Sequence, residues 1–423
     1  MNVRAWFSRK EWAVLGSSLV LSALIVSSVF WAQPTNTVDL GYSILGSTIR
    51  VQTDADVRLA PFYTVFFTAY EANAPEEEKQ AIRDVLTAEV PRLHAYADRR
   101  HTFVDIQGNP IVNLKMLNDH YGEASWLTID EDFYRLLALA QTLTVTTQGQ
   151  FNMFLGSVSD FWDARLSDPL YPLNYTDMDP LFNPVVRDDL MHRLSFVPRT
   201  EADILSTLEL EGNDGIYRVR FHAFNGAEKG ELLISLGAIA KGFANDVLTT
   251  MLSEANYTRG FISNGTSSIT TIGPRYGNRP YTWKVTSPLD GIDFAYELAI
   301  PGRHALSTSG AYTGIRIKAG NQRILRHHII DPSTGYPSTY AVEINLVSTT
   351  MDAASLDALS TAMMTMDQAT AYALRERFIE QGETLDIAWV EIINEQLAVT
   401  YTDGYAPYLN TMNNVRYQRY QNV

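Results

Sequence analysis

A long uncharged run near the start of the chain restricts its architecture more than any other feature. Residues 13–32 read AVLGSSLVLSALIVSSVFWA, and Arg4, Arg9 and Lys10 precede them. A helix of this length is about what a bilayer crossing requires, and basic residues on one flank favour a cytoplasmic N-terminus. We therefore expect residues 13–32 to be a single-pass transmembrane signal anchor, with residues 1–12 in the cytoplasm.

A cleaved signal peptide is the alternative interpretation of this run. Cleavage needs small residues at the cut, whereas the run ends in Phe30, Trp31 and Ala32, so an uncleaved anchor is favoured. Residues 33–40 then read as a tether. Since nothing later in the chain resembles a second span, we expect the remainder to lie on the extracytoplasmic face of the cell membrane.

Charge and cysteine content exclude several classes of protein. The formal net charge is −15, which argues against a nucleic-acid partner because phosphates must be met by a basic surface. Within this acidic chain, residues 323–328 are the densest basic segment. The chain has no cysteine, so disulfides, zinc–thiolate sites, iron–sulfur clusters, thiol catalysis and Cys-linked lipid anchors are all excluded.

Hydrophobic periodicity predicts alternating strands and helices. A proline followed by acidic residues opens an expected helix from Pro75 to Val90, and apolar spacing predicts two more, Asp130–Thr147 and Ala240–Leu252. The expected strands are 46–51, 234–236, 269–272, 281–286, 341–349, 389–393 and 397–401. Such a mixture favours an α+β fold. Residues 167–228 are more weakly patterned and read as an elaborated connection or a small lobe.

Asp357 and Thr361 are the strongest pair of candidate metal ligands. They are four residues apart, which places both side chains on one face of a helix. Oxygen ligands of this kind suit magnesium, although a solvated face or a capping contact commonly explains such a pair. Upstream, His328 precedes Ile-Ile-Asp-Pro and adds a group that can transfer a proton.

Two other segments suit a ligand that contains phosphate. Residues 235–246 (SLGAIAKGFAND) pass through small residues into a helix start, where free N–H groups suit an anion. Close packing of that helix on a sheet is the alternative, and the P-loop spacing is absent. Residues 263–268 (SNGTSS) form a polar loop that fits either a ligand or an ordinary turn.

Taken together, these segments resemble the ApbE family, the FAD:protein FMN transferases. The family patterns are approximately GxFDPTVGPxxxxW, DLGGIAKGYAxD, a Gly/Ser-rich loop ending in LG, TSGxY, SHIIDPxTGxP and DALxTA. The chain carries them in that order as GQFNMFLGSVSDFW, SLGAIAKGFAND, SNGTSSITTIG, TSGAY, HHIIDPSTGYP and DALSTA. The resemblance covers residues 46–373 and implies one ApbE-like, T-fold-related catalytic domain of two lobes at residues 41–423.

This resemblance implies a reaction and a metal site. Family members use FAD and Mg²⁺ and move FMN onto a threonine, sometimes serine, hydroxyl of a partner flavoprotein, which releases AMP and leaves a phosphoester-linked flavin. The implied metal ligands are the side chains of Asp357 and Thr361 and the backbone carbonyl of Ala238. Ser360 lies close enough in sequence to add a contact. The resemblance places His328 at the reacting centre, where it accepts the hydroxyl proton or steadies the phosphates.

The resemblance also implies FAD contacts and a kind of partner. Leu45, Asn152, Ser235 and Lys241, with His328, occupy positions where the family contacts FAD. The implied partner is a flavin-acceptor domain of a membrane-bound or extracellular redox protein.

Three departures from the family pattern keep other functions open. Asn152 and Ser235 replace a usual aspartate, and Ala311 stands where Asp or Asn often follows TSG. The alternatives are an FAD pyrophosphatase that releases FMN and AMP, and a non-catalytic surface flavin-binding protein. The intact metal pair and His328 favour the transferase.

Overall fold

The computed structural model describes residues 37–44, 47–52, 65–67, 76–105, 107–265, 267–274, 278–287, 292–311 and 314–421. The expected anchor at 13–32 and the expected FAD contact Leu45 lie outside these residues. None of the helices in the described part of the chain has the length and apolar character that a membrane crossing needs.

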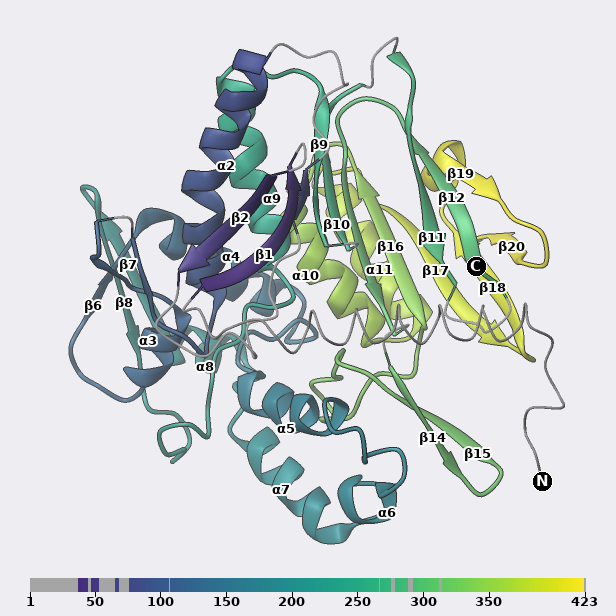
Figure 1. Cartoon of the computed structure of the whole chain (residues 1–423). Coiled ribbons are helices and arrows are strands. Elements are labelled where there is room, and N and C mark those ends of the chain that lie inside the picture. Colours follow the sequence, from purple (N-terminus) through teal and green to yellow (C-terminus); the bar gives the residue numbers. More distant parts are fainter. Residues whose placement is uncertain are drawn as a thin grey trace, which may run out of the picture.

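An eight-stranded sheet forms the centre of the molecule (Figure 1). Its order is β20–β18–β17–β16–β13–β10–β9–β3, and its pairs are antiparallel except for β18–β20. In that order, the strands are Arg416–Arg419, Gln396–Tyr401, Asp386–Ile393, Glu343–Ser348, Ala305–Gly310, Ser268–Gly273, Gly260–Asn264 and Val65–Phe67.

Both faces of this sheet are covered. Helices α9 (Ala240–Glu254) and α10 (Ala353–Met364) pack on one face, and α11 (Gln368–Glu380) packs against α10. A three-stranded sheet of β11 (Tyr281–Thr286), β12 (Phe294–Ile300) and β19 (Leu409–Thr411) covers the other face, near the short helix η4 (Asp403–Tyr408). All of β16 is therefore buried, as expected of a strand with cover on both sides.

A second region lies beside the helix layer (Figure 1). It contains the sheet β6–β8–β7 (Leu127–Ile129, Ile216–Phe221 and Leu208–Asn213) with α3 (Leu114–Asp119), α4 (Glu131–Thr146) and α8 (Glu201–Thr207). Helices α5 (Gly156–Leu166), α6 (Tyr175–Met178) and α7 (Pro184–Ser195) form the lower part of the view. The remaining elements are α2 (Glu76–Ala97) and the strand pairs β1–β2 (Thr37–Ile44, Ser47–Gln52), β4–β5 (Phe103–Val104, Pro110–Ile111) and β14–β15 (Ile315–Ala319, Gln322–Arg326).

The α+β prediction and most expected elements are confirmed, with three corrections. Helix α2 continues through Pro91 to Ala97, because Val90, Leu93 and Tyr96 are buried and burial outweighs the lost hydrogen bond. Residues 234–236 are not a strand; only isolated bridges form beside them. Strand β1 begins at Thr37, inside the expected tether.

The weakly patterned segment 167–228 is structured. It holds α6, α7 and α8 and the β7–β8 hairpin. Its strand β8 pairs with β6, which lies far upstream in the sequence, and β7 pairs with β8. Pairing between distant segments stabilises these strands, and local periodicity in the sequence does not reveal such pairing.

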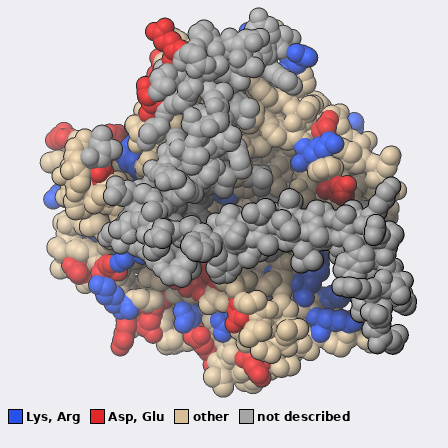
Figure 2. Space-filling model, in the orientation of Figure 1, with Lys and Arg blue, Asp and Glu red and all other residues tan. Residues whose placement is uncertain are grey.

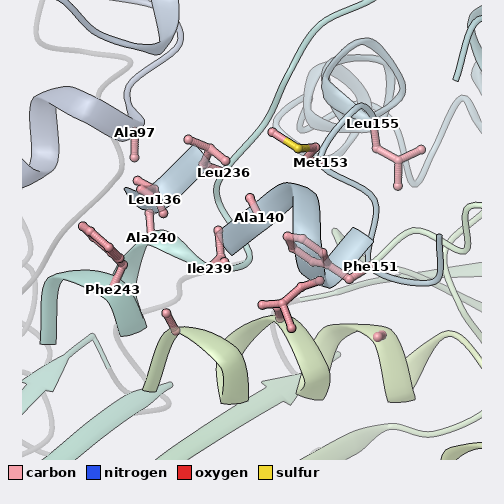
Figure 3. Close-up of a cluster of buried hydrophobic side chains, with 14 of the residues drawn as sticks. Ala97, Leu136, Ala140, Phe151, Met153, Leu155, Leu236, Ile239, Ala240 and Phe243 are labelled. Atoms are coloured by element: carbon pink, nitrogen blue, oxygen red, sulfur yellow. The ribbon is translucent and has the colours of Figure 1, made fainter. Parts of the chain in front are cut away.

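One hydrophobic core joins the second region to the helix layer. Figure 3 shows side chains of α4, of residues 151–155 and of residues 236–243 meeting in one cluster. Leu236 and Ile239 are fully buried there. This packing fixes the chain that leads into α9 and so supports the candidate site.

Candidate active site

Strand β13 presents two hydroxyls to helix α10. Ser307 and Ser309 are two residues apart, so both side chains lie on the same face of the sheet. The Ser309 hydroxyl lies 2.8 Å from the Ser360 hydroxyl and 3.2 Å from that of Thr361. The strand thereby places a row of oxygen atoms along the helix face that also carries Asp357.

Asp357 is the buried carboxylate at the centre of this row. Ser307 Oγ donates to its Oδ1 at 2.6 Å, and the Gly242 N–H donates to its Oδ2 at 2.7 Å. Burial raises the pKa of Asp357 to about 6, against the opposing effects of the Lys241 charge and these hydrogen bonds. A buried carboxylate among hydroxyls is a hard-oxygen donor set of the kind that suits Mg²⁺.

Helices α9 and α10 cap each other near their first turns. Asp357 of α10 accepts from Gly242 of α9, while Asp246 of α9 accepts from the Ala353 and Ala354 N–H groups of α10, each at 2.9 Å. A Cβ on Gly242 would overlap the Ala353 backbone. One N–H that we expected to be free for an anion at the start of α9 is therefore occupied by the chain's own carboxylate.

Lys241 lies near this carboxylate, near His328 and beside the loop after β9. Its Nζ donates to the Ser267 hydroxyl, and its charge is near enough to lower the pKa of both Asp357 and His328. The polar loop expected at 263–268 thus adjoins the candidate metal ligands.

His328 is exposed to solvent, whereas the neighbouring His327 is fully buried. Desolvation by the surrounding protein lowers the pKa of His328, and the nearby Lys241 charge lowers it further. The ring is therefore neutral at pH 7 and open to an arriving substrate. His327 is a structural residue: its Nε2 donates to the Ser338 carbonyl at 2.8 Å, and its Nδ1 accepts from the Ile329 N–H.

A buried ion pair holds the strand that leads to His328. Arg326 makes two hydrogen bonds to Asp179, at 2.8 and 3.2 Å, and Tyr171 donates to the same carboxylate at 2.6 Å. Asp179 is fully buried and Arg326 is nearly so. The turn after His328 is fixed separately, because Trp162 Nε1 donates to the Gly335 carbonyl at 2.7 Å.

The expected FAD contacts Asn152 and Ser235 lie on adjacent segments. The Ser235 N–H donates to the Met153 carbonyl at 2.8 Å. The Asn152 amide donates to the Pro198 carbonyl and accepts from the Phe154 N–H. A carboxylate could not donate to the Pro198 carbonyl, so asparagine at position 152 makes a hydrogen bond in this loop that aspartate could not make. The contact of either residue with FAD stays a prediction.

The structure places Lys241 near Asp357, and Thr361 beside Ser309 in the same row of oxygen atoms. Ala238 lies just before α9 and is half-buried. Sequence reasoning assigned no role to Ser307, Ser309 or Asp246. The spacing of Ser307 and Ser309 was the available signal, since alternate residues of a strand share a face. Nothing local indicates that Asp246 caps a helix more than 100 residues away.

The fold and site define an α+β protein with an oxygen-rich site between a central sheet and two mutually capped helices. Solved structures share this fold. They include the ApbE protein of Thermotoga maritima, with a TM-score of 0.52, 23% identity and coverage of 82% of this chain and 92% of that one. The flavin transferase ApbE of Vibrio cholerae gives a TM-score of 0.56 at 17% identity and covers 86% and 95%.

The family is established by sequence. A family model described as the ApbE family matches residues 68–385, and the chain belongs to that family. Curated relatives named FAD:protein FMN transferase include those of Buchnera aphidicola (22% identical, 59% of this chain and 66% of that protein) and Treponema pallidum (26%, 63% and 68%). The alignment with the Salmonella typhimurium relative spans only 43% of that protein.

Proposed function

We propose that this protein transfers FMN from FAD to a threonine or serine hydroxyl of a partner flavoprotein, with Mg²⁺ as cofactor and AMP as the leaving group. The observation that carries the proposal is the convergence of Asp357, Thr361 and the hydroxyls of Ser307, Ser309 and Ser360 beside Lys241. The names of the curated relatives support the same activity.

In the proposed reaction, the acceptor hydroxyl oxygen attacks the phosphorus of the FMN half of FAD. The bond from that phosphorus to the bridging oxygen breaks, and the electron pair leaves with AMP. His328, neutral at pH 7, accepts the hydroxyl proton. Lys241 contributes positive charge near the pyrophosphate, where stabilisation of charge is the main catalytic need.

The described residues fit Mg²⁺, the metal that the resemblance implies. Asp357, Thr361 and the carbonyl of Ala238 would hold Mg²⁺, with Ser309 and Ser360 close to Thr361. When bound, Mg²⁺ would neutralise charge on the phosphates. We further propose that the body of the chain acts on the extracytoplasmic face of the membrane, held there by residues 13–32 and facing a membrane-bound or extracellular redox protein.

The test is the intact mass of a flavin-acceptor domain after incubation with the protein, FAD and Mg²⁺. We expect a gain of one FMN, with a loss of about 100-fold or more in rate for His328→Ala and no detectable gain for Asp357→Ala. His192→Ala and Asp188→Ala, at exposed positions, are the matched controls. AMP release without any mass gain would indicate a pyrophosphatase, and intact bound FAD would indicate a flavin-binding protein.

A further inference from the structure

The β14–β15 hairpin is a basic surface on an acidic chain. Arg316, Lys318 and Arg323 are exposed on it, and residues 315–330 contain no Asp or Glu, whereas the net charge of the chain is −15. In Figure 2, Lys and Arg side chains gather at the lower right, where Figure 1 places β14 and β15. The hairpin is tight, since Ala319 pairs with Gln322 and Gly320 has a φ of +60°.

The three bases lie on one face of the hairpin. Arg316 and Lys318 are two residues apart and flank Ile317, which is buried on the opposite face. Lys318 lies directly opposite Arg323 in the strand register. Like charges in this position destabilise a sheet, so stability does not account for the arrangement. An anionic ligand does, because it would offset the repulsion.

This face has a fixed position relative to the candidate active site. Arg326 ends β15 and is anchored to the buried Asp179. His328 follows two residues later, and the intervening His327 is held by Ser338. The three basic side chains therefore project from a hairpin whose second strand ends two residues before His328, at the anchored Arg326.

We propose that Arg316, Lys318 and Arg323 recognise an acidic segment of the acceptor protein next to the hydroxyl that receives FMN. The inference rests on the proposed function, because an enzyme that modifies a protein must contact that protein beside the reacting hydroxyl. Complementary charge at such a surface mainly raises the association rate and the specificity. It also makes both sensitive to salt.

The test compares a triple variant, Arg316→Gln/Lys318→Gln/Arg323→Gln, with a matched control, Lys229→Gln/Arg377→Gln/Arg416→Gln. The control removes the same charge from exposed positions outside the hairpin. Binding of two fluorescein-labelled peptides is measured by anisotropy. Each peptide has one threonine, which is flanked by glutamates in one and by glutamines in the other.

We expect the wild type and the control to bind the acidic peptide about tenfold more tightly than the neutral one at low salt. The hairpin variant should lose this preference while it keeps its melting temperature and its affinity for FAD. An unchanged preference in the hairpin variant, or none in the wild type, would overturn the inference. Loss of FAD affinity instead would assign the bases to the dinucleotide. Loss only of binding to phosphatidylglycerol vesicles would assign them to a membrane surface.

A transfer assay separates this inference from the proposed function. If the wild type modifies an acceptor domain, we expect the hairpin variant to raise the KM for that acceptor about tenfold with little change in kcat. An unchanged KM would refute the inference and leave the transferase intact. A hairpin-dependent charge preference without any transfer would refute the transferase and leave the binding surface.

Discussion

At the residue scale, two buried acidic side chains differ in the hydrogen bonds that they accept. Asp357 accepts from a backbone N–H and a hydroxyl, whereas Glu343, also fully buried, is bonded to the Tyr296 hydroxyl at 3.3 Å. Burial raises the pKa of Glu343 to about 8. We infer that Glu343 is protonated at neutral pH and is a structural acid outside the site.

Glu343 predicts a pH dependence of stability. The pKa of Glu343 in the folded state, about 8, lies above the ordinary value of 4.5. The stability that its bound proton contributes is therefore fully present below pH 4.5 and is lost as the pH rises through 8. The loss is at most about 5 kcal/mol. Urea unfolding gives the free energy of unfolding at pH 5 and at pH 9. The decrease between these two pH values should be smaller for Glu343→Gln than for the wild type. Equal decreases would contradict this assignment.

At the element scale, the contact between α9 and α10 builds the site. Each helix supplies a carboxylate to the first turn of the other. The close approach requires the absence of a side chain at Gly242. The packing of the two helices and the positions of the proposed metal ligands therefore depend on one another.

Gly242→Ala should disturb both stability and activity. Its Cβ would meet the Ala353 backbone, so the helices must separate at a cost of about 1–3 kcal/mol. The hydrogen bond from Gly242 to Asp357 would lengthen, and transfer should fall with it. Thr250→Ala, at an exposed position of the same helix, is the control for both chemical unfolding and FMN transfer. A variant with wild-type stability would show that the packing can relax.

We expect the Asp179–Arg326 ion pair to hold His328 in position. Asp179→Ala leaves a buried, unpaired guanidinium, which costs about 3–5 kcal/mol, and should lower kcat. The double variant Asp179→Ala/Arg326→Met should lose less stability than the two single changes added together, because no buried charge remains. Asp189→Ala, which breaks an exposed pair with Arg193, should cost less than about 1 kcal/mol. Strict additivity would argue against coupling within the buried pair.

At the scale of the whole molecule, the chain combines an expected membrane anchor with a body in which one core joins two regions. The body is held by long-range pairing: β6 joins the β7–β8 hairpin, and the eight-stranded sheet gathers strands from residues 65 to 419. The hydrophobic cluster that joins these regions also packs around the candidate site, so it should unfold cooperatively with the site. This is why Gly242→Ala and Asp179→Ala are expected to affect stability and activity together.

The anchor predicts how the intact chain fractionates. The full chain should sediment with membranes and resist alkaline carbonate, because residues 13–32 would span the bilayer. A chain that begins at residue 33 should remain in the supernatant with its transferase activity intact. A mature N-terminus found near residue 33 would instead support the cleaved signal peptide. Sedimentation of the shortened chain would show that another surface binds the membrane.

Local pattern determined the elements and the motif residues. Helices α4 and α9 were predictable because their apolar residues recur with the helical period and their ends carry local signals. Helix α2 was predicted too short at Pro91, since only the packed surroundings show that burial outweighs the missing hydrogen bond. The candidate metal pair was predictable because Asp357 and Thr361 are four residues apart and so share one helix face.

Tertiary structure alone decided which residues meet at the site. Ser307 and Ser309 reach Asp357, Ser360 and Thr361 across about 50 residues of chain because the strand register and the α10 packing place them there. The mutual capping of α9 and α10 and the alignment of Lys318 with Arg323 depend likewise on contacts between distant segments or on register. The periodicity of the sequence shows which face of a helix or strand a residue occupies. Only the packing of the elements decides which other residues contact that face.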